Sequence, residues 1–201
     1  MKPSNPQLDL PTGTRIHVTG NSCSGKSTLA ERLAEALGVP FVELDALNWE
    51  PGWISLDSTD PQELERRILQ ATAGDGWVVA GSYREPSQRL FWSRLQCVVW
   101  LDLPMPLLVW RAIVRSWQRW RSNELLWGKN YERFWPQLMV WNKDESLIGW
   151  IVSQHHHKRR VMIADMADPR WAHIRFIHLR STSRIRAFIE SVENSLFDSI
   201  P

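Results

Sequence analysis

Apolar positions follow two patterns along this chain: short apolar runs, and longer stretches in which apolar residues recur every three to four positions. The short runs predict β-strands over residues 15–19, 41–45, 77–81, 97–102 and 174–179. The longer stretches predict helices that end at Leu37, that span 61–73, 106–121 and 143–158, and that close the chain after Ser183. Strands that alternate with helices predict a doubly wound α/β fold with ligands at the carboxyl ends of the strands.

Turn residues and apolar content refine this picture. Gly38 follows the first helix at a position typical of a helix end, and Pro61 stands at the first position of another helix. The third and fourth strands are apolar throughout, which is typical of parallel strands covered on both faces. With 201 residues the chain is long enough for a substantial core, and we expect one domain over 1–201. Residues 1–13, with three prolines, are expected to form a loose arm.

A complete G-x-x-x-x-G-K-[ST] motif lies between the first strand and the first helix, in the strand–loop–helix context that this motif requires. In such a loop the backbone N–H groups surround an anion, Lys26 reaches the β- and γ-phosphates, and the Ser27 hydroxyl can ligate Mg²⁺. The motif therefore predicts that the chain binds a nucleoside triphosphate; the alternative is a glycine-rich turn without a ligand. The expected binding residues are Gly20, Asn21, Ser22, Cys23, Ser24, Gly25, Lys26, Ser27 and Thr28.

The composition limits the classes of binding partner that the chain is expected to have. Lys and Arg total 24 against 22 Asp and Glu, so no bulk charge favours nucleic acid, which we regard as an improbable partner. The N-terminal residues lack the apolar segment of a signal peptide, and no window approaches the length of a membrane span. Two distant cysteines form neither a disulfide framework nor a metal site. We expect a cytoplasmic protein without a membrane partner; monomer and homodimer both stay open.

Four segments carry a resemblance to a known family: GNSCSGKSTLAERLAEALGVPFVELDALNW, GDGWVVAGSYRE, VVWLDLP and WRAIVRSWQRW. In this order they resemble the adenylate-kinase-like branch of the P-loop kinases, and within it the small topology-modulation (FlaR-like) proteins. The resemblance implies a P-loop NTPase fold, three layers α/β/α with a five-stranded, mostly parallel sheet in the order 2-3-1-4-5, and ATP with Mg²⁺ as cofactors. It also implies a core over 14–44, 76–118 and 160–201, an acceptor-binding region over 45–75, and a helical lid over 119–142.

The same resemblance suggests residues for the phosphate acceptor. Asp45, at the end of the second predicted strand, is expected to orient an acceptor hydroxyl or to hold a water on Mg²⁺; the alternative is a capping or turn aspartate. Arg84 follows the third strand, where nucleotide kinases bind the acceptor's phosphate, and a solvated arginine is its alternative. Trp49 is expected to line the acceptor pocket.

Three arginines, Arg111, Arg115 and Arg119, share one helix face because they are four residues apart. The resemblance implies that Arg111 stacks on adenine and that Arg115 acts in catalysis by binding phosphate, work that suits a guanidinium. A solvated charged face is the alternative. We expect Arg119, Lys129 and Arg133 to be the cations of the lid, and Arg180 to border the adenine.

One departure weakens the kinase interpretation. The third strand ends in Ala80-Gly81, where nucleotide kinases usually have Asp-Gly, so Asp45 and Asp102 are the only well-placed acids. The leading hypothesis is transfer of the γ-phosphoryl of ATP to a small molecule, with a nucleoside monophosphate as one candidate acceptor. The alternative is an ATP-binding regulator with little or no kinase activity, acting through a protein or DNA partner.

Two further patterns have no assigned role. Among 13 tryptophans, Trp110, Trp117, Trp120 and Trp127 recur at one-face helical spacing, which favours core or interface packing and leaves base stacking or a dimer contact open. The run from His155 to Arg160 is expected to be a solvated basic helix end, with phosphate or nucleic-acid binding as the alternative.

Overall fold

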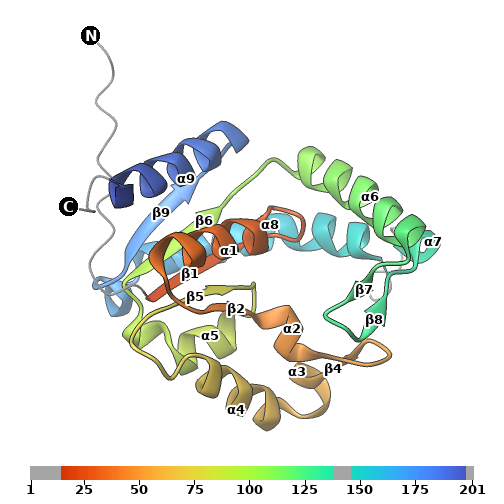
Figure 1. The fold of residues 1–201 in the computed structure, drawn as a ribbon, viewed down its shortest axis with the longest axis horizontal. Helices are drawn as coiled ribbons and strands as arrows, with labels where there is room; N and C mark the ends of the chain where they lie inside the picture. Colours follow the sequence, from red (N-terminus) through yellow and green to blue (C-terminus); the bar gives the residue numbers. More distant parts are fainter. Residues whose placement is uncertain (1–14, 138–145, 198–201) are drawn as a thin grey trace.

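The structure is a computed structural model, which describes residues 15–137 and 146–197. A five-stranded parallel sheet forms its centre, in the order β2-β5-β1-β6-β9, which confirms the predicted order 2-3-1-4-5 (Figure 1). Each predicted strand is present. The strands are β1 (Arg15–Gly20), β2 (Phe41–Glu43), β5 (Trp77–Ala80), β6 (Cys97–Leu101) and β9 (Arg175–Leu179).

Side-chain alternation along these strands divides the core into two apolar clusters, one on each face of the sheet. Val78 and Val99 pack on one face with α1 (Lys26–Leu37) and α9 (Thr182–Phe197), while Val79 and Val98 pack on the other. The second face is covered by α4 (Pro61–Ala71), α5 (Arg84–Leu90) and the short helix η1 (Trp92–Arg94). Because both faces are covered, the strands contain continuous apolar runs.

Two long helices, α6 (Met105–Ser122) and α8 (Leu147–Ala167), pack against each other through a third apolar cluster that contains Leu108, Ala112 and Ile151. The predicted start of the second of these helices, residues 143–145, lies outside the described residues. Its predicted end at 158 is wrong, because no Gly or Pro stands between Lys158 and Asp168-Pro169. The run from His155 to Arg160 therefore lies within α8 and is not a helix end.

The region after β2 is organised differently from the prediction. The second strand ends at Glu43, and Asp45 belongs to a short helix, α2 (Leu44–Asn48). A hairpin of β3 (Trp49–Glu50) and β4 (Ile54–Ser55) follows, then α3 (Leu56–Thr59). These elements are too short to produce a periodic pattern in the sequence.

A second small hairpin follows α6. It joins β7 (Leu125–Leu126) to β8 (Asn130–Tyr131) and leads into α7 (Phe134–Gln137). Figure 1 shows this hairpin beside the β3–β4 hairpin. The predicted lid, 119–142, covers this hairpin and α7, and its last residues, 138–142, lie outside the described part of the chain. The remaining short helix is η2 (Pro169–Trp171), between α8 and β9.

The tryptophans of α6 do not pack in the core. Trp110, Trp117 and Trp120 are 64%, 42% and 43% exposed. The buried face of α6 instead consists of Leu108, Ala112 and Ser116, spaced four residues apart. Core packing, one half of the predicted core-or-interface role, is therefore wrong for these three residues, because the spacing identified a common face without showing which face contacts the protein; interface packing stays a prediction. No helix in the described ranges is both long and apolar enough to cross a bilayer.

Gly81 allows α2 to approach the sheet closely. A Cβ at this position would lie 2.6–2.9 Å from three side-chain atoms of buried Leu44. We expect Gly81→Ala to lower the free energy of unfolding by about 1–3 kcal/mol through overpacking. Urea denaturation measures the change. Gly74→Ala is the control, since its Cβ would have 3.9 Å to its nearest neighbour and should change stability by less than about 0.5 kcal/mol. Equal stabilities of the two variants would contradict the packing argument.

Candidate active site

The phosphate loop connects β1 to α1 and is held from both sides. Gly25 has φ 92°, and the buried Nζ of Lys26 donates to the backbone oxygen of Asn21 at 3.1 Å. The Asn21 side chain accepts from the N–H of Ser22 at 2.8 Å and donates to the carbonyl of Ile151, in α8, at 3.1 Å. The loop geometry is therefore preorganised by the fold around it. Burial lowers the pKa of Lys26, and the nearby Asp45 carboxylate opposes part of that shift.

A carboxylate that sequence reasoning missed lies against this loop. The Ser27 hydroxyl donates to Glu43 at 2.5 Å, and the other Glu43 oxygen accepts from the indole N–H of Trp127 at 3.0 Å. Sheet register pairs Glu43 with Ala80, so an acid stands on the neighbouring strand where the third strand lacks one. Ala80 itself is buried in the apolar cluster under α1. The only available signal was the acidic pair Glu43-x-Asp45 directly after a strand.

These groups open into a single large cleft. Its volume is about 1410 Å³, and it extends from the phosphate loop to the β3–β4 hairpin and along α6. The predicted residues that line it are Ser22, Cys23, Gly25, Lys26, Ser27, Thr28, Asp45, Trp49, Arg84, Arg111, Arg115 and Arg119. The structure thus brings together most of the residues that the sequence proposed for ATP and for an acceptor.

Asp45 faces the cleft from α2, not from a strand end. Its carboxylate accepts the hydroxyl proton of Tyr83 in a hydrogen bond of 2.8 Å. Burial and the nearby Asp45 carboxylate raise the pKa of Tyr83 above its ordinary range, so the phenol stays a neutral donor. Tyr83 thereby fixes the orientation of Asp45 and leaves its second oxygen available to a ligand.

The arginines of α6 face the cleft as predicted, with different partners. Arg111 donates to the carbonyl of Ser24 at 3.4 Å and to the Thr182 hydroxyl at 3.3 Å, so it bridges the phosphate loop and the start of α9. Within the described residues, the buried Nε of Arg115 has no hydrogen-bond partner. Arg119 is paired with Glu132 at 3.5 Å and Glu124 at 3.6 Å. Of the three, Arg115 is best placed to bind an incoming anion.

Other predicted cations are already engaged or lie elsewhere. Arg84 binds Asp165 through both carboxylate oxygens while still lining the cleft. Lys129 donates to the carbonyl of Trp49 at 3.1 Å and lies 3.5 Å from Glu50. Arg133 is exposed, and neither it nor Arg180 is among the residues that line the cleft. Their predicted roles therefore need a conformation in which they approach the ligand.

Asp102 belongs to a separate ionic cluster. Its carboxylate lies 2.9 Å from His178, 3.2 Å from Arg159 and 4.0 Å from Arg180. His178 also stacks on Trp100 with ring centroids 4.0 Å apart. With its side chain only 7% exposed, Asp102 joins β6, α8 and β9 and does not reach the cleft.

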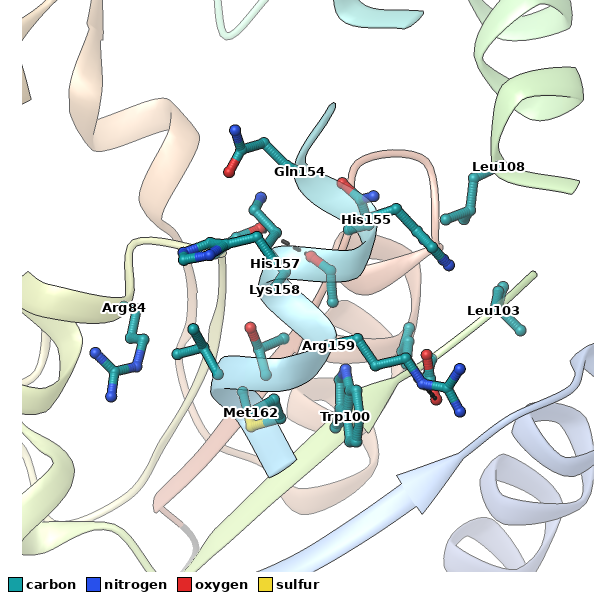
Figure 2. A pocket seen from close by; sticks show the side chains of 17 residues that line it. Arg84, Trp100, Leu103, Leu108, Gln154, His155, His157, Lys158, Arg159 and Met162 are labelled. Carbon is teal, nitrogen blue, oxygen red and sulfur yellow. Dashed lines mark hydrogen bonds and ion pairs between the residues drawn. The ribbon is translucent and has the colours of Figure 1, made fainter. Parts of the chain in front are cut away.

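A smaller pocket of about 210 Å³ lies between α8, the end of β6 and the back of the phosphate loop. Figure 2 shows α8 crossing it, with His155 on the side of Leu103 and Leu108 and His157 on the side of Arg84. The solvated-helix interpretation is wrong for Lys158, which lines both this pocket and the large cleft. Burial lowers the pKa of Lys158 to about 8, and the positive charge of Lys26 contributes to this shift.

The groups around Ser27 fit a magnesium ion bound together with phosphate. In the described ranges no three His, Cys, Asp or Glu side chains form a metal-binding cluster. Mg²⁺ in nucleotide sites needs no such cluster, because substrate phosphates and waters supply most of its ligands beside one or two protein groups. The Ser27 hydroxyl and the Glu43 carboxylate provide oxygen ligands of the required kind within one hydrogen bond of each other.

Fold and loop together define the class: an α/β fold of the P-loop kinase type with its phosphate loop facing a deep cleft. Among solved structures, the chain is similar to a gluconokinase from Sinorhizobium meliloti (22% identity, 92% of this chain and 93% of that one, TM-score 0.52). It is also similar to a shikimate kinase from Acinetobacter baumannii (18% identity, 94% and 97% covered, TM-score 0.51). These similarities establish the fold.

Sequence comparison gives a consistent result over part of the chain. The chain is 33% identical over 113 residues to a shikimate kinase from Salinibacter ruber, covering 51% of this chain and 55% of that protein. A shikimate kinase from Synechococcus elongatus is 30% identical over 118 residues, covering 49% of this chain and 57% of the relative. The chain thus spans about half the length of the curated relatives it matches. No protein-family model matches it. Both of these curated relatives are shikimate kinases, and the finer FlaR-like resemblance stays a prediction.

The Arg84–Asp165 pair tests whether Arg84 has a structural role. The Asp165 side chain is 2% exposed, so Arg84→Ala would leave a buried carboxylate without its cation and destabilise the fold by about 1–3 kcal/mol. We expect the double variant Arg84→Ala/Asp165→Asn to be more stable than the sum of the single changes predicts, with coupling above about 1 kcal/mol. Urea denaturation of the wild type, the two single variants and the double variant measures the coupling free energy.

Arg66→Ala is the matched control, because it breaks an exposed pair with Glu63 and should cost less than about 1 kcal/mol. Additive effects of the Arg84 and Asp165 changes would show that the pair contributes nothing to stability and would leave Arg84 free for a ligand.

Proposed function

We propose that this protein transfers the γ-phosphoryl group of ATP to a small-molecule acceptor. The observation that carries the proposal is one cleft that contains Lys26, the Ser27–Glu43 pair, Arg115 and Asp45. Phosphoryl transfer needs positioning and charge stabilisation more than covalent help from the protein. This cleft supplies both, with cations and an oxygen-ligand pair at the phosphate loop and the Asp45 carboxylate close to Lys26.

The donor end would hold ATP. The loop N–H groups and Lys26 bind the β- and γ-phosphates, Arg111 faces the base between Ser24 and Thr182, and Arg115 neutralises charge on the transferred group. Ser27 and Glu43 would hold Mg²⁺, which neutralises phosphate charge when bound. We therefore assign Glu43 the role that an aspartate at the end of the third strand would have in a nucleotide kinase.

The acceptor end would hold a hydroxyl compound. Asp45, oriented by Tyr83, accepts the hydroxyl proton as the acceptor oxygen forms its bond to phosphorus. The bond from phosphorus to the β,γ-bridging oxygen breaks at the same time, and ADP leaves. The proton passes from Asp45 to solvent after product release, so atoms and charge balance over the cycle.

Charge at the acceptor end favours an anionic acceptor. Lys158 and Arg84 both line the cleft with Asp45, and Lys158 is close enough to Asp45 for their charges to interact. Shikimate and gluconate, the acceptors in the names of the relatives, carry a carboxylate beside several hydroxyls. A nucleoside monophosphate would present a phosphate instead. We propose an acceptor with a hydroxyl and an anionic group. A carboxylate and a phosphate are both candidates for that anionic group.

The regulatory alternative loses its main support in this interpretation. It depended on the absent carboxylate at Ala80, the tryptophan stripe, and a basic run free for nucleic acid. Glu43 offers a carboxylate on the neighbouring strand, and Lys158 of the basic run faces the cleft. The exposed tryptophans of α6 are the feature that still favours a partner.

The proposal predicts ATP consumption that depends on an acceptor. We would measure ADP formation with Mg²⁺, alone and with shikimate, gluconate, other hydroxy acids, nucleosides and nucleoside monophosphates. ADP formation that requires one acceptor and falls at least about 100-fold in Lys26→Ala is expected, because the lysine charge acts on the transferring phosphoryl. ATP binding without turnover on any acceptor would favour the regulator.

The titration of Lys158 predicts how that activity depends on pH. Lys158 binds an anion in its protonated form, which is lost as the pH rises through its pKa of about 8. We expect kcat/KM for the anionic acceptor to fall roughly ten-fold between pH 7 and pH 9. Lys158→Arg should stay active without this fall, since a guanidinium keeps its charge. Lys158→Gln should be weak throughout. If Lys158→Arg shows the same fall in kcat/KM, that fall comes from the titration of another group.

A further inference from the structure

The two small hairpins are joined directly to each other, and one of them contacts the Ser27–Glu43 pair that we propose holds Mg²⁺. The Asn130 side chain, 3% exposed, accepts from the N–H of Trp53 and donates to the carbonyl of Glu50, each at 3.0 Å. The Trp53 indole donates to the carbonyl of Tyr131 at 3.0 Å. Two segments 77 to 80 residues apart in sequence are therefore joined to each other, and Trp53 and Trp127 of these segments line the cleft. Figure 1 shows the two hairpins side by side.

The tips of both hairpins have an unusual backbone. Trp53 has φ 62° beside Gly52, and Trp127 has φ 50° beside Gly128. A bulky residue rarely adopts this left-handed conformation, which persists only where surrounding contacts hold it. The two indoles face each other edge to face with ring centroids 6.1 Å apart. Both positions lie at hairpin tips, where tight turns call for this backbone, and the two tryptophans meet there.

The contact continues from Trp127 to the carboxylate of Glu43. The Trp127 indole N–H donates to one oxygen of Glu43 at 3.0 Å, while the Ser27 hydroxyl donates to the other at 2.5 Å. A carboxylate held by two fixed donors keeps one orientation. If the hairpins separate, Glu43 loses one of these donors and can turn away from Ser27.

We infer that Trp127 is a positioning residue for the magnesium site: the β7–β8 hairpin orients Glu43, so metal affinity depends on the hairpins being closed over the acceptor. This inference rests on the proposed function, since it concerns the same site. Groups that orient a metal ligand commonly change metal affinity by ten-fold or more when removed. Coupling is reciprocal, so bound metal also favours closed hairpins.

The test uses binding rather than turnover. Calorimetric titration of the full chain with ADP, once in EDTA and once in MgCl₂, gives the factor by which Mg²⁺ increases ADP affinity. Trp127→Phe keeps an aromatic ring and removes the N–H. We expect it to reduce that factor about ten-fold while ADP affinity in EDTA stays within about two-fold of the wild type.

Four further variants complete the design. Glu43→Gln should reduce the factor as much, and its combination with Trp127→Phe should reduce it no further, because both changes act through one carboxylate. Asn130→Ala, which leaves Glu43 untouched, should reduce it through opening of the hairpins. Trp120→Phe is the matched control, an exposed tryptophan of α6 that does not line the cleft, and should leave the factor unchanged.

The outcomes separate the inference from the proposed function. A wild-type factor preserved in Trp127→Phe overturns the inference, and so does a loss of ADP affinity in EDTA, which is what a merely structural role would produce. If the wild-type protein binds ADP equally well with and without Mg²⁺, the inference is overturned, although the phosphate loop still binds nucleotide. Absence of ADP binding in both buffers overturns the proposed function itself.

Discussion

The parallel pairing of β1 between β5 and β6 is the constraint on which the rest of this structure depends. This pairing places the phosphate loop at the carboxyl edge of the sheet and aligns Gly20 with Leu101. It leaves so little room that a Cβ on Gly20 would lie 2.6 Å from the carbonyl of Leu101. The same sheet register brings Glu43 beside Ala80 and therefore near Ser27.

From this edge, the cleft is built partly by short elements. The helix α2 anchors in the core through buried Leu44, and hydrogen bonds of Asn130 and Trp53 join the short β3–β4 and β7–β8 hairpins. The buried sheet fixes the phosphate loop, while these small elements line the part of the cleft that we propose holds the acceptor. A scaffold of this kind suits a site that must open to admit ligands and close to exclude water.

Several cationic side chains in the site already have a partner within the protein. Arg84 and Arg119 are engaged in ion pairs, while Lys26 is held by the loop carbonyl of Asn21. Arg115 and Lys158 both line the cleft; the Nε of Arg115 is buried without a hydrogen-bond partner among the described residues, and burial lowers the pKa of Lys158. These two residues come from α6 and α8, which pack against each other, so their spacing is set by a third apolar cluster and not by the loop itself.

The sequence by itself determined the fold class, the strand order through family resemblance, and the phosphate loop, because apolar runs and the glycine–lysine motif are local patterns with a direct physical meaning. It also singled out Asp45, Arg111 and Arg115, which line the cleft. Tertiary structure alone decided that Glu43 meets Ser27, that Arg84 binds Asp165, that Lys158 faces the cleft, and that the tryptophans of α6 stay exposed. Each of these depends on contacts between residues distant in sequence, such as Arg84 and Asp165, which no local pattern records.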